Sequence, residues 1–240
     1  MTQESNALLR CIKGWKRTRL GPFRAFYFEL SGQTCLLVTS GMGIHRARQA
    51  ARTLIETNSL HCLVSFGIAG AVEADLEVGD VVMVESVCSL EHGQPGPLLP
   101  LRHWPGSARE AATQALSGYG ARLFTGTAVT TPGTQVAEDQ LKGIDHPVLE
   151  METAGIAQAA AEKGIPLLSL RAISDGPRAP IPVDLSGIMD ENANLQAGRL
   201  LKAVVRHPGI ILRSGQMTRN TRLAADNAAI ALGAALSRIP

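Results

Sequence analysis

The sequence predicts an α/β protein in which a central, mostly parallel mixed sheet lies between two layers of helices. Apolar runs typical of buried strands alternate with segments of helical periodicity over most of the chain, which favours a sheet covered on both faces. Glycines gather where the predicted strands end, at the edge where such folds bind ligands. With 240 residues, 45% of them apolar, the chain suffices for one domain, residues 1–240, with a full core.

The first half of the chain opens with a predicted hairpin. Two β-rich runs, Phe23–Leu30 and Gln33–Thr39, are joined by Ser31-Gly32, which suits a tight turn. After Gly41-Met42-Gly43 the apolar positions follow a helical period, so a helix is expected there. The next strands expected are Cys62–Ile68 and Val81–Val87.

The second half continues the alternation after a segment without periodicity. Residues Leu90–Gly106 are rich in Pro and Gly and predict a surface loop that borders the site. The elements expected beyond it are helix Ser107–Leu116 with a Ser cap, strand Ala121–Thr130, helix Thr134–Leu141, strand Val148–Glu152, helix Thr153–Lys163 and strand Leu167–Ser174. The last three predict a β-α-β unit of parallel type. Two or three helices are expected in a C-terminal region, residues 186–240.

Charge, cysteine and histidine patterns exclude several classes of protein. The formal net charge of +2 is too small for a protein that follows nucleic-acid phosphates. No segment has the roughly 20 consecutive apolar residues that cross a bilayer, and Met1–Arg10 lacks a signal-peptide core. The four cysteines show no C-x-x-C spacing, which predicts a reduced, cytoplasmic protein. The six histidines form no ligand motif, so no metal is expected.

Carboxylates stand at the ends of two predicted strands. Glu150 and Glu152 lie beside a strand-to-helix junction, where burial is costly without a partner, and a polyol ligand would be such a partner. The strand Leu167–Ser174 delivers Ser174 and Asp175 to its carboxyl end, a usual place for catalytic groups. The alternatives are a helix N-cap or a helix-dipole contact for Glu152 and an Asp-Gly turn for Asp175.

Four short segments occur in a fixed order along the chain, and the ordered set is a far more specific signal of a protein family than any one segment. They are Ser40-Gly41-Met42-Gly43, then Ser65-Phe66-Gly67-Ile68-Ala69-Gly70 with Val78-Gly79-Asp80, then Glu150-Met151-Glu152, and last Arg171-Ala172-Ile173-Ser174-Asp175. With these segments the chain resembles the nucleoside phosphorylase and nucleosidase superfamily along nearly its whole length. The resemblance implies an oligomeric enzyme that cleaves a purine base from a ribose-derived group, with phosphate as a potential co-substrate and no other cofactor.

The resemblance also implies a role for two of the carboxylates. Asp175 would protonate N7 of the purine, so that the base leaves as a neutral species. Glu152 would accept hydrogen bonds from the ribose 2′- and 3′-hydroxyls and offset the positive charge that grows as the sugar approaches an oxocarbenium ion.

Around these two groups the resemblance implies a binding pocket. Met151 would pack against the ribose and Ser174 would hold the acid or a base nitrogen, with core packing and a strand-end serine as the alternatives. Ala69 and Gly70 would let backbone amides approach the base or an anion, with tight-turn geometry as the alternative. Glu150 completes the substrate-binding set.

Two kinds of nucleophile are possible in this superfamily. Its hydrolases activate water with an N-terminal glutamate that follows an apolar strand, but here no such strand precedes the sole counterpart, Glu4. A terminal residue is expected to be mobile, so either the start is truncated or water activation is impaired. Its phosphorylases hold phosphate with glycine amides and arginines, and Gly43, Arg46 and Arg48 at a predicted helix start are candidates. A solvated helix face is the alternative for the arginines.

Two further features bear on the substrate. Val129 falls near the place where the nucleosidases carry an aromatic platform for adenine and departs from that pattern. The residue sequence of Ser65–Gly70, together with Trp104 and a basic C-terminal region, most resembles that of the hopanoid-associated phosphorylase subgroup. This resemblance implies adenosylhopane as the substrate.

The basic C-terminal region also suggests a partner. Between Asn192 and Ala225 basic and apolar residues alternate without an acidic residue, which would suit a peripheral contact with a membrane surface. A core-packed helix with a solvated basic face, or an oligomer contact, is the alternative.

Two other classes of function stay open beside the enzyme. A protein that binds nucleosides without turnover would fit the missing first strand and Val129. A dinucleotide-binding dehydrogenase is disfavoured, because Gly41-Met42-Gly43 lacks the third glycine of that motif and Arg46 takes its place.

Overall fold

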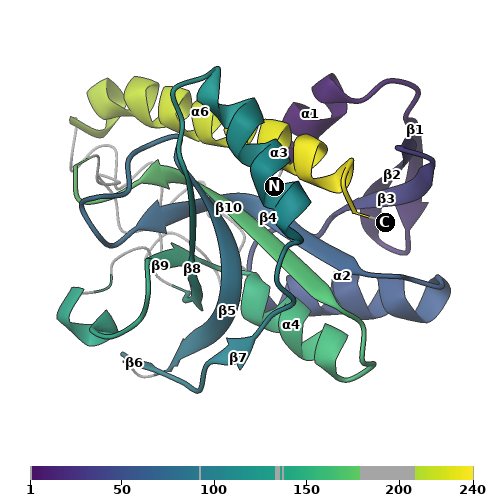
Figure 1. Cartoon of the computed structure of the whole chain (residues 1–240). Coiled ribbons are helices and arrows are strands. Elements are labelled where there is room, and N and C mark those ends of the chain that lie inside the picture. Colours follow the sequence, from purple (N-terminus) through teal and green to yellow (C-terminus); the bar gives the residue numbers. More distant parts are fainter. Residues whose placement is uncertain (1, 92, 133–135, 137, 179–208, 240) are drawn as a thin grey trace.

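The computed structural model describes residues 2–91, 93–132, 136, 138–178 and 209–239. Its helices are α1 (Thr2–Cys11), α2 (Ile44–Thr57), α3 (Gly106–Ser117), α4 (Thr153–Ala161) and α6 (Gly209–Leu236), with a 3-10 turn η1 (Glu138–Leu141). Its strands are β1 (Lys16–Leu20), β2 (Phe23–Leu30), β3 (Gln33–Thr39), β4 (Leu63–Ala71), β5 (Val81–Glu91), β6 (Gln94–Pro95), β7 (Leu99–Pro100), β8 (Leu123–Thr130), β9 (Pro147–Glu150) and β10 (Leu167–Asp175). These elements confirm the predicted α/β class (Figure 1).

The main sheet is mixed, as predicted, but it also closes on itself. Its strands follow the order β10-β4-β9-β8-β5, and β5 pairs again with β10. The pairs β4–β10, β5–β8 and β8–β9 are parallel, whereas β4–β9 and β5–β10 are antiparallel. The predicted parallel β-α-β unit is therefore wrong, because β9 runs opposite to β4 while β10 runs along it. Periodicity reports burial and does not report strand direction.

A second sheet stands apart from this barrel. The predicted hairpin is confirmed as β2 and β3, and β1 adds a third antiparallel strand, giving the order β1-β2-β3. Helix α1, which the sequence analysis did not predict, precedes this sheet.

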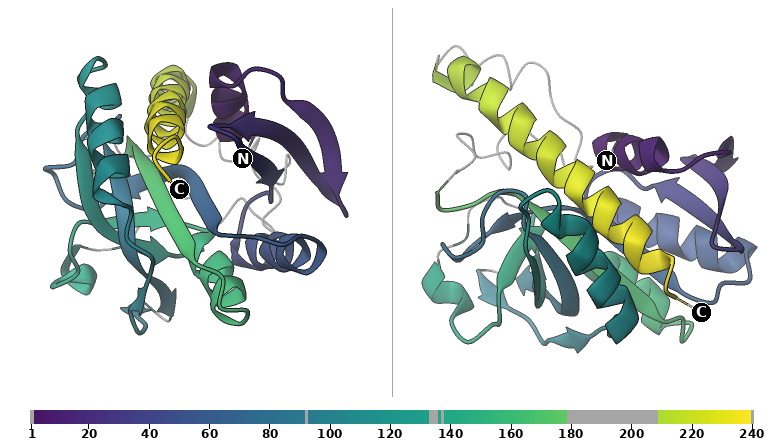
Figure 2. Two further views of the ribbon diagram at one scale, coloured as in Figure 1. Left: turned by 45° about the vertical axis from the view of Figure 1, so that its right-hand side comes forward. Right: turned by 45° about the horizontal axis from the view of Figure 1, so that its top comes forward.

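Helices cover the barrel from two sides. Helices α3, α6 and α1 lie side by side on one side (Figure 2), and α2 packs against α4 on the other. The first layer buries leucine and alanine side chains, among them Leu8, Leu116 and Leu232, in one cluster with residues of β5 and β10 such as Met83 and Leu170. Gly155 lets α4 approach the start of α2, because a Cβ there would collide with the carbonyl oxygen of Ile44.

The segment predicted as a surface loop is more ordered than expected. Strand β5 runs on to Glu91, and β6 and β7 both pair with it. Trp104 is buried and its Nε1 donates to the carbonyl oxygen of Ser169 at 2.9 Å. Helix α3 begins after Pro105 with no side-chain cap, so the predicted Ser cap is wrong.

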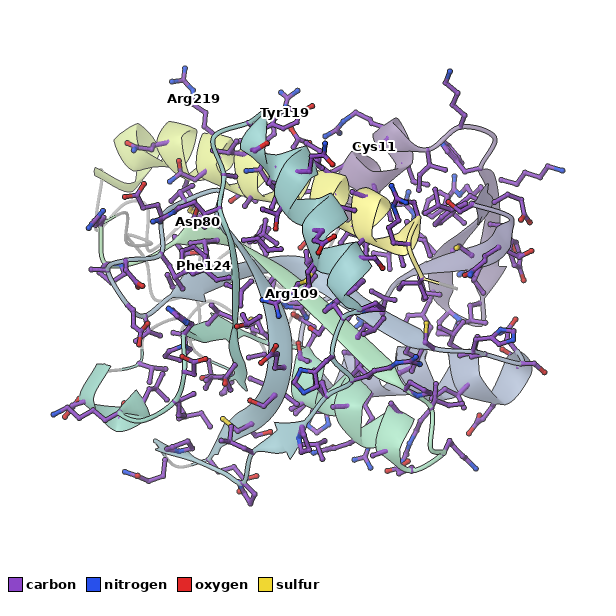
Figure 3. All side chains as sticks on the ribbon, viewed as in Figure 1. Cys11, Asp80, Arg109, Tyr119, Phe124 and Arg219 are labelled. Atoms are coloured by element: carbon purple, nitrogen blue, oxygen red, sulfur yellow. The ribbon has the colours of Figure 1, made fainter. Side chains whose placement is uncertain are left out.

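Only part of the predicted C-terminal helical region can be compared. Residues 179–208 lie outside the described residues, and with them Arg199, Lys202 and Arg206; the side chain of Arg213 does too. Between Ala224 and Ala235, α6 is packed into the core, whereas Arg219 and Arg222 are exposed, and Arg219 points away from the fold (Figure 3). Among the described helices, none combines the length and the apolar character that a bilayer crossing requires.

Candidate functional site

A buried polar network holds the junction between β9 and α4. Glu150 Oε2 accepts hydrogen bonds from the amides of Glu152 (3.0 Å) and Thr153 (2.7 Å) and from Thr153 Oγ1 (2.7 Å). Its Oε1 accepts from Thr130 Oγ1 at the end of β8. The Arg171 guanidinium in β10 pairs with Oε2 at 3.1 Å and donates to Thr153 Oγ1 at 2.6 Å.

The network keeps Glu150 ionised and away from ligands. Burial on its own raises the pKa of Glu150, but Arg171 and the hydrogen bonds from both threonines outweigh it, so the pKa is lowered. The predicted substrate-binding role for Glu150 therefore finds no support, because protein donors occupy both of its oxygens. Its partner is an arginine on β10, which β4 separates from β9, where the sequence analysis expected a polyol.

Glu152 has a different environment, although it is only two residues further on. Its Oε1 accepts a hydrogen bond from the amide of Gly43 at 2.9 Å, which ties the β9–α4 junction to the start of α2. Burial and the neighbouring charge of Glu150 raise the pKa of Glu152. The residue stands before α4 without capping it through its side chain, so the helix-cap alternative does not apply.

Glu152 opens onto a cavity of about 320 Å³ that Glu4 and Arg171 also line. Glu4 lies in α1 and is only 5% exposed, contrary to the mobile terminus that the sequence predicted. Its Oε1 and Arg171 Nη1 stand 3.4 and 3.9 Å from the point where Gly67 would carry a Cβ. Glycine at this position of β4 leaves room for both charged groups at the polar end of the cavity.

Asp175 lies beside the carboxyl end of β4. A register shift in β10 between Ile173 and Asp175 brings Asp175 opposite Gly70, and such bulges re-aim side chains. A Cβ on Gly70 would stand 2.7 Å from Asp175 Oδ2, so only glycine leaves this space free. Ser174 Oγ donates to Asp175 Oδ1 at 2.6 Å, and burial raises the pKa of Asp175 above its usual value despite this bond.

The predicted site residues therefore fall into two groups along β4. Glu4 and Glu152 share one cavity, whose wall follows β4 as far as Ile68. Asp175 faces Gly70, two residues further along. The distance from Gly67 to Gly70 is about 10 Å, because a strand rises about 3.3 Å per residue.

The three phosphate candidates do not converge. The Gly43 amide is already hydrogen-bonded to Glu152. Arg48 pairs with Glu162, the residue that follows α4, at 2.5 Å, and a second arginine, Arg52, pairs with the same carboxylate. Arg46 is exposed, and its Nε lies 3.4 Å from the carbonyl oxygen of Ser40. The solvated helix face that the sequence analysis held as the alternative describes exposed Arg46, whereas Arg48 is half-buried and paired with Glu162.

Other predicted pocket residues take structural positions. Val129 is fully buried in a core cluster with Val72, Cys88 and Leu141, and it does not line the cavity. Ala69 is buried in a second core cluster, and its carbonyl oxygen accepts from Ser174 Oγ at 3.3 Å. Met151 is half-buried at the junction after β9.

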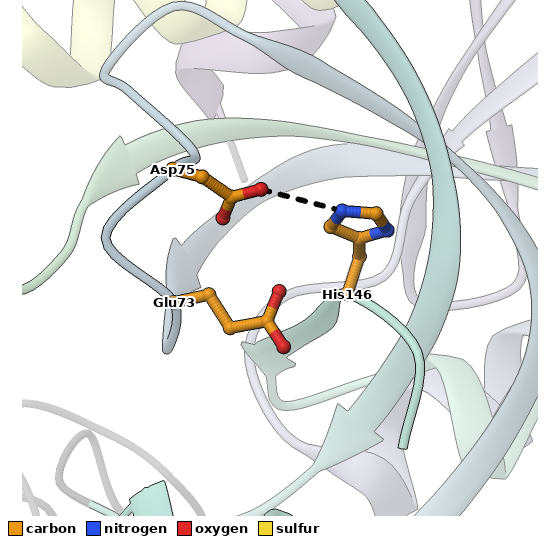
Figure 4. Close-up of side chains that lie close together, drawn as sticks. All are labelled: Glu73, Asp75 and His146. Carbon is orange, nitrogen blue, oxygen red and sulfur yellow. Dashed lines mark ion pairs between the residues drawn. The ribbon is translucent and has the colours of Figure 1, made fainter. Parts of the chain in front are cut away.

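A group that could hold a metal ion stands apart from the cavity. Glu73 and Asp75 follow β4, His146 precedes β9, and their ligand atoms lie within 4.8 Å of one another (Figure 4). His146 Nε2 lies 3.4 Å from Asp75, and its Nδ1 lies 3.3 Å from Asp145. Glu73 and Asp75 are far from His146 in the sequence, so motif spacing could not have predicted that these residues meet. Each ring nitrogen of His146 already has a carboxylate oxygen close to it, so the arrangement does not by itself require an ion.

Sequence reasoning gave no role to Arg171, which the structure places at the centre of the site. A signal was present: this arginine interrupts the apolar strand Leu167–Ser174, and a buried guanidinium requires a carboxylate partner. Pairing it with Glu150 would have separated the structural carboxylate from Glu152.

Comparisons with known proteins agree on the family. Residues 2–206 match the model of the phosphorylase superfamily. The chain is 26% identical over 190 residues to a 5′-methylthioadenosine/S-adenosylhomocysteine nucleosidase of Haemophilus influenzae, covering 73% of this chain and 83% of that protein. A nucleosidase of the same name from Hydrogenovibrio crunogenus is 26% identical over 221 residues, covering 85% and 95%.

Solved structures show the same fold. A nucleosidase of that name from Neisseria meningitidis, in complex with methylthio-immucillin-A, superposes with a TM-score of 0.71 at 22% identity, covering 100% of this chain and 96% of that chain. A futalosine hydrolase of Helicobacter pylori gives a TM-score of 0.70 at 15% identity, covering 100% and 95%. Since the family model spans most of the sequence, the chain belongs to the phosphorylase superfamily.

Proposed function

We propose that this protein hydrolyses the N-glycosidic bond of an adenine nucleoside. One observation carries the proposal: two carboxyl groups have raised pKa values, Asp175 opposite Gly70 of β4 and Glu152 on the cavity, and Glu4 faces the same cavity as Glu152. Gly67, beside Glu4, and Gly70, opposite Asp175, are about 10 Å apart along the strand, which is of the order of a nucleoside's length. The nucleosidases among its relatives are named for this chemistry.

Asp175 is the proposed acid for the leaving base. A carboxyl with a raised pKa keeps its proton closer to neutral pH, which general acid catalysis requires. Ser174 donates to Oδ1 and leaves Oδ2, in the space above Gly70, to deliver the proton to N7 of the purine.

Glu152 is the proposed partner of the ribose hydroxyls. Its Oε1 is anchored by the Gly43 amide, so its orientation is set before substrate arrives. Hydrogen bonds to a preorganised carboxylate strengthen as positive charge develops on the sugar. In this proposal Met151, the neighbouring residue, packs against the ribose.

Water is the proposed acceptor of the ribosyl group. Glu4 is buried at the polar end of the cavity, where a carboxylate can activate a water molecule as a general base. The Gly43 amide and the Arg48 guanidinium are engaged by Glu152 and Glu162, so these phosphate candidates have other partners. The proposed reaction therefore needs no cofactor and no phosphate.

The experiment is release of free adenine, measured by mass spectrometry, from adenosine, methylthioadenosine and adenosylhopane, each with and without phosphate. We expect release in the absence of phosphate, and loss of that release in Glu4→Gln. Release that requires phosphate would replace hydrolysis by phosphorolysis. Binding of adenine without release from any substrate would favour a protein that binds nucleosides without turnover.

The substrate arms of that experiment also test the 5′ substituent. The similarity of Ser65–Gly70 to the hopanoid-associated subgroup supports adenosylhopane, and the nucleosidase relatives support methylthioadenosine. We expect the preferred substrate to exceed the others in kcat/KM, which assigns the substituent directly.

We also propose a membrane contact, an oligomeric state and a location for the protein. A peripheral membrane contact is supported by exposed Arg219 and Arg222 on α6, and co-sedimentation with anionic vesicles tests it. Homo-oligomer formation is supported by exposed Leu98 and Leu99 and is tested by light scattering. A cytoplasmic location agrees with four free thiols.

A further inference from the structure

Basic residues are concentrated in the part of the chain that forms the small sheet. Between Glu4 and Glu29 the sequence contains six lysine and arginine residues and no acidic residue, although the net charge of the whole chain is only +2. This stretch includes the end of α1, all of β1 and most of β2. Its charges therefore gather where the small sheet stands at one flank of the molecule, beside α1 (Figure 1).

The strand pattern brings three of these arginines onto one face of the sheet. Successive residues of a strand point to opposite faces, so Arg17 and Arg19 of β1 share a face. Arg19 lies directly opposite Arg24 of β2 in the antiparallel register, which places Arg24 on that face too. All three residues are exposed. We call the surface formed by these arginines and the adjacent Trp15 the basic corner.

The three guanidinium groups have no counter-charge on the described part of the protein. Within the residues that the structure describes, no carboxylate pairs with any of them. Arg19 donates to the carbonyl oxygen of Pro22 at 3.3 Å. The Arg24 guanidinium stands 6.0 Å from the centre of the Phe26 ring. Like charges directly opposite each other on paired strands destabilise a sheet, and Arg19 with Arg24 is such a pair, so a bound anion would relieve their repulsion.

Trp15 adds an aromatic group beside the arginines. It stands just before β1, and its ring packs edge-on against Phe26 with the two centroids 5.5 Å apart. The residue is nevertheless 42% exposed. Tryptophan is favoured at the headgroup level of a bilayer, where its ring meets an apolar phase and its N–H meets water. Contact with Phe26 holds the indole at the same end of the sheet as the arginines.

The geometry points to a lipid surface: we propose that the basic corner docks the protein on an anionic membrane, with its arginines against lipid phosphates and Trp15 among the headgroups. A guanidinium group binds phosphate oxygens through paired hydrogen bonds. A bilayer presents many phosphates in one plane, so three arginines on one face can bind at once. A second copy of this chain pairing edge to edge through β1 is disfavoured, because Arg17 and Arg19 would meet the same charges.

This proposal rests on the membrane contact proposed above and assigns it to a surface. On α6, Arg222 lies 3.9 Å from Asp226, which also pairs with Arg10, so part of the charge of that helix is already neutralised. The arginines of the basic corner have no such partner among the described residues. We therefore expect the basic corner to contribute more to membrane binding than Arg219 and Arg222 do.

The test is co-sedimentation of the full chain with vesicles of phosphatidylglycerol and phosphatidylcholine, beside vesicles of phosphatidylcholine alone. We expect binding to the anionic vesicles only, and release in high salt, which screens exposed charges. The partition coefficient should fall by about 25-fold in Arg17→Gln with Arg19→Gln, because each basic residue at an anionic surface contributes roughly fivefold. The matched control, Arg219→Gln with Arg222→Gln, removes the same charge from α6 and should lower binding less. All four arginines are exposed, so both double variants should keep the wild-type midpoint of urea denaturation.

The native tryptophans report whether the basic corner itself reaches the bilayer. Brominated acyl chains quench an indole that enters the headgroup region, so vesicles that carry them should quench Trp15. Trp104 is buried in the core and should keep its emission. Trp15→Phe retains an aromatic ring against Phe26 and should abolish the quenching.

The outcomes separate this proposal from the proposed reaction. An equal or greater loss of binding in the α6 variant, or the absence of Trp15 quenching, overturns the assignment to the basic corner. Absence of binding to anionic vesicles overturns the membrane contact on any surface. A labelled RNA oligonucleotide tests the other polyanion: tighter binding to RNA than to vesicles at the same salt, lost in Arg17→Gln with Arg19→Gln, overturns the lipid assignment. Adenine release is measured separately, and none of these readouts depends on turnover.

Discussion

Glu150 and Glu152 stand two residues apart at the end of β9, yet their environments differ in kind. Glu150 is saturated by Arg171, two threonines and two amides, and its pKa is lowered. Glu152 has one amide donor and opens onto a cavity, and its pKa is raised, as is that of Asp175. A buried carboxylate with a complete set of partners stabilises the fold, whereas one left with spare capacity is available to a ligand.

Replacing Asp175 by Asn should have the largest effect, and that effect should fall on the rate of the reaction while the fold is kept. The amide occupies the same space above Gly70 but cannot give up a proton, so kcat for adenine release should fall by about 10²–10⁴-fold. The measurement is single-turnover kinetics beside a denaturation curve, with Ser174→Ala as the matched control at the residue that orients the acid. Full activity in Asp175→Asn would remove Asp175 from the mechanism.

Replacing Glu150 by Gln should act in the opposite way, on the fold. The Arg171 charge would stay buried without its counter-ion, and breaking a buried pair costs about 3–5 kcal/mol in the free energy of unfolding. Urea denaturation measures the loss. The double variant Glu150→Gln with Arg171→Met should recover part of it, since no unpaired charge remains; equal instability of the double variant would contradict this explanation.

The same contrast predicts opposite dependences of stability on pH. Folding raises the pKa of Asp175 above its ordinary value of 3.8. Such a carboxyl contributes its full stability when the pH is below the ordinary pKa, and that contribution is lost as the pH rises through the folded pKa. Glu150, whose pKa is lowered, contributes stability above its ordinary value of 4.5 that is lost as pH falls through the folded pKa. The free energy of unfolding should therefore decline less with rising pH in Asp175→Asn, where Glu152 keeps its raised pKa, and fall less with acid in Glu150→Gln. Parallel pH curves for the two variants would contradict the contrast.

Sequence reasoning located the carboxylates and most of the strands around them, but it could not determine which carboxylate is structural and which is available to a ligand. Hydrophobic period and glycine position gave β2, β3, α2, β4 and β10 close to their observed bounds. The burial of Val129 in the core, the closure of the barrel and the register shift that aims Asp175 at Gly70 depend on which strands become neighbours. That choice is made by tertiary packing, and a single sequence does not display it. The same limit hid the pairing of Arg171 with Glu150.

The smallest effect is expected from Arg48→Ala, which tests whether the start of α2 belongs to the site. Arg48 and Glu162 are both more than one third exposed, and exposed pairs of this kind contribute little to stability. Arg52 keeps its own contacts with Glu162, so the denaturation midpoint should hardly move. The rate of adenine release, with or without phosphate, should equal that of the wild type. A selective fall in a phosphate-dependent rate would instead mean that Arg48 leaves Glu162 to bind phosphate. The face of α2 that carries Arg48 would then belong to the functional site.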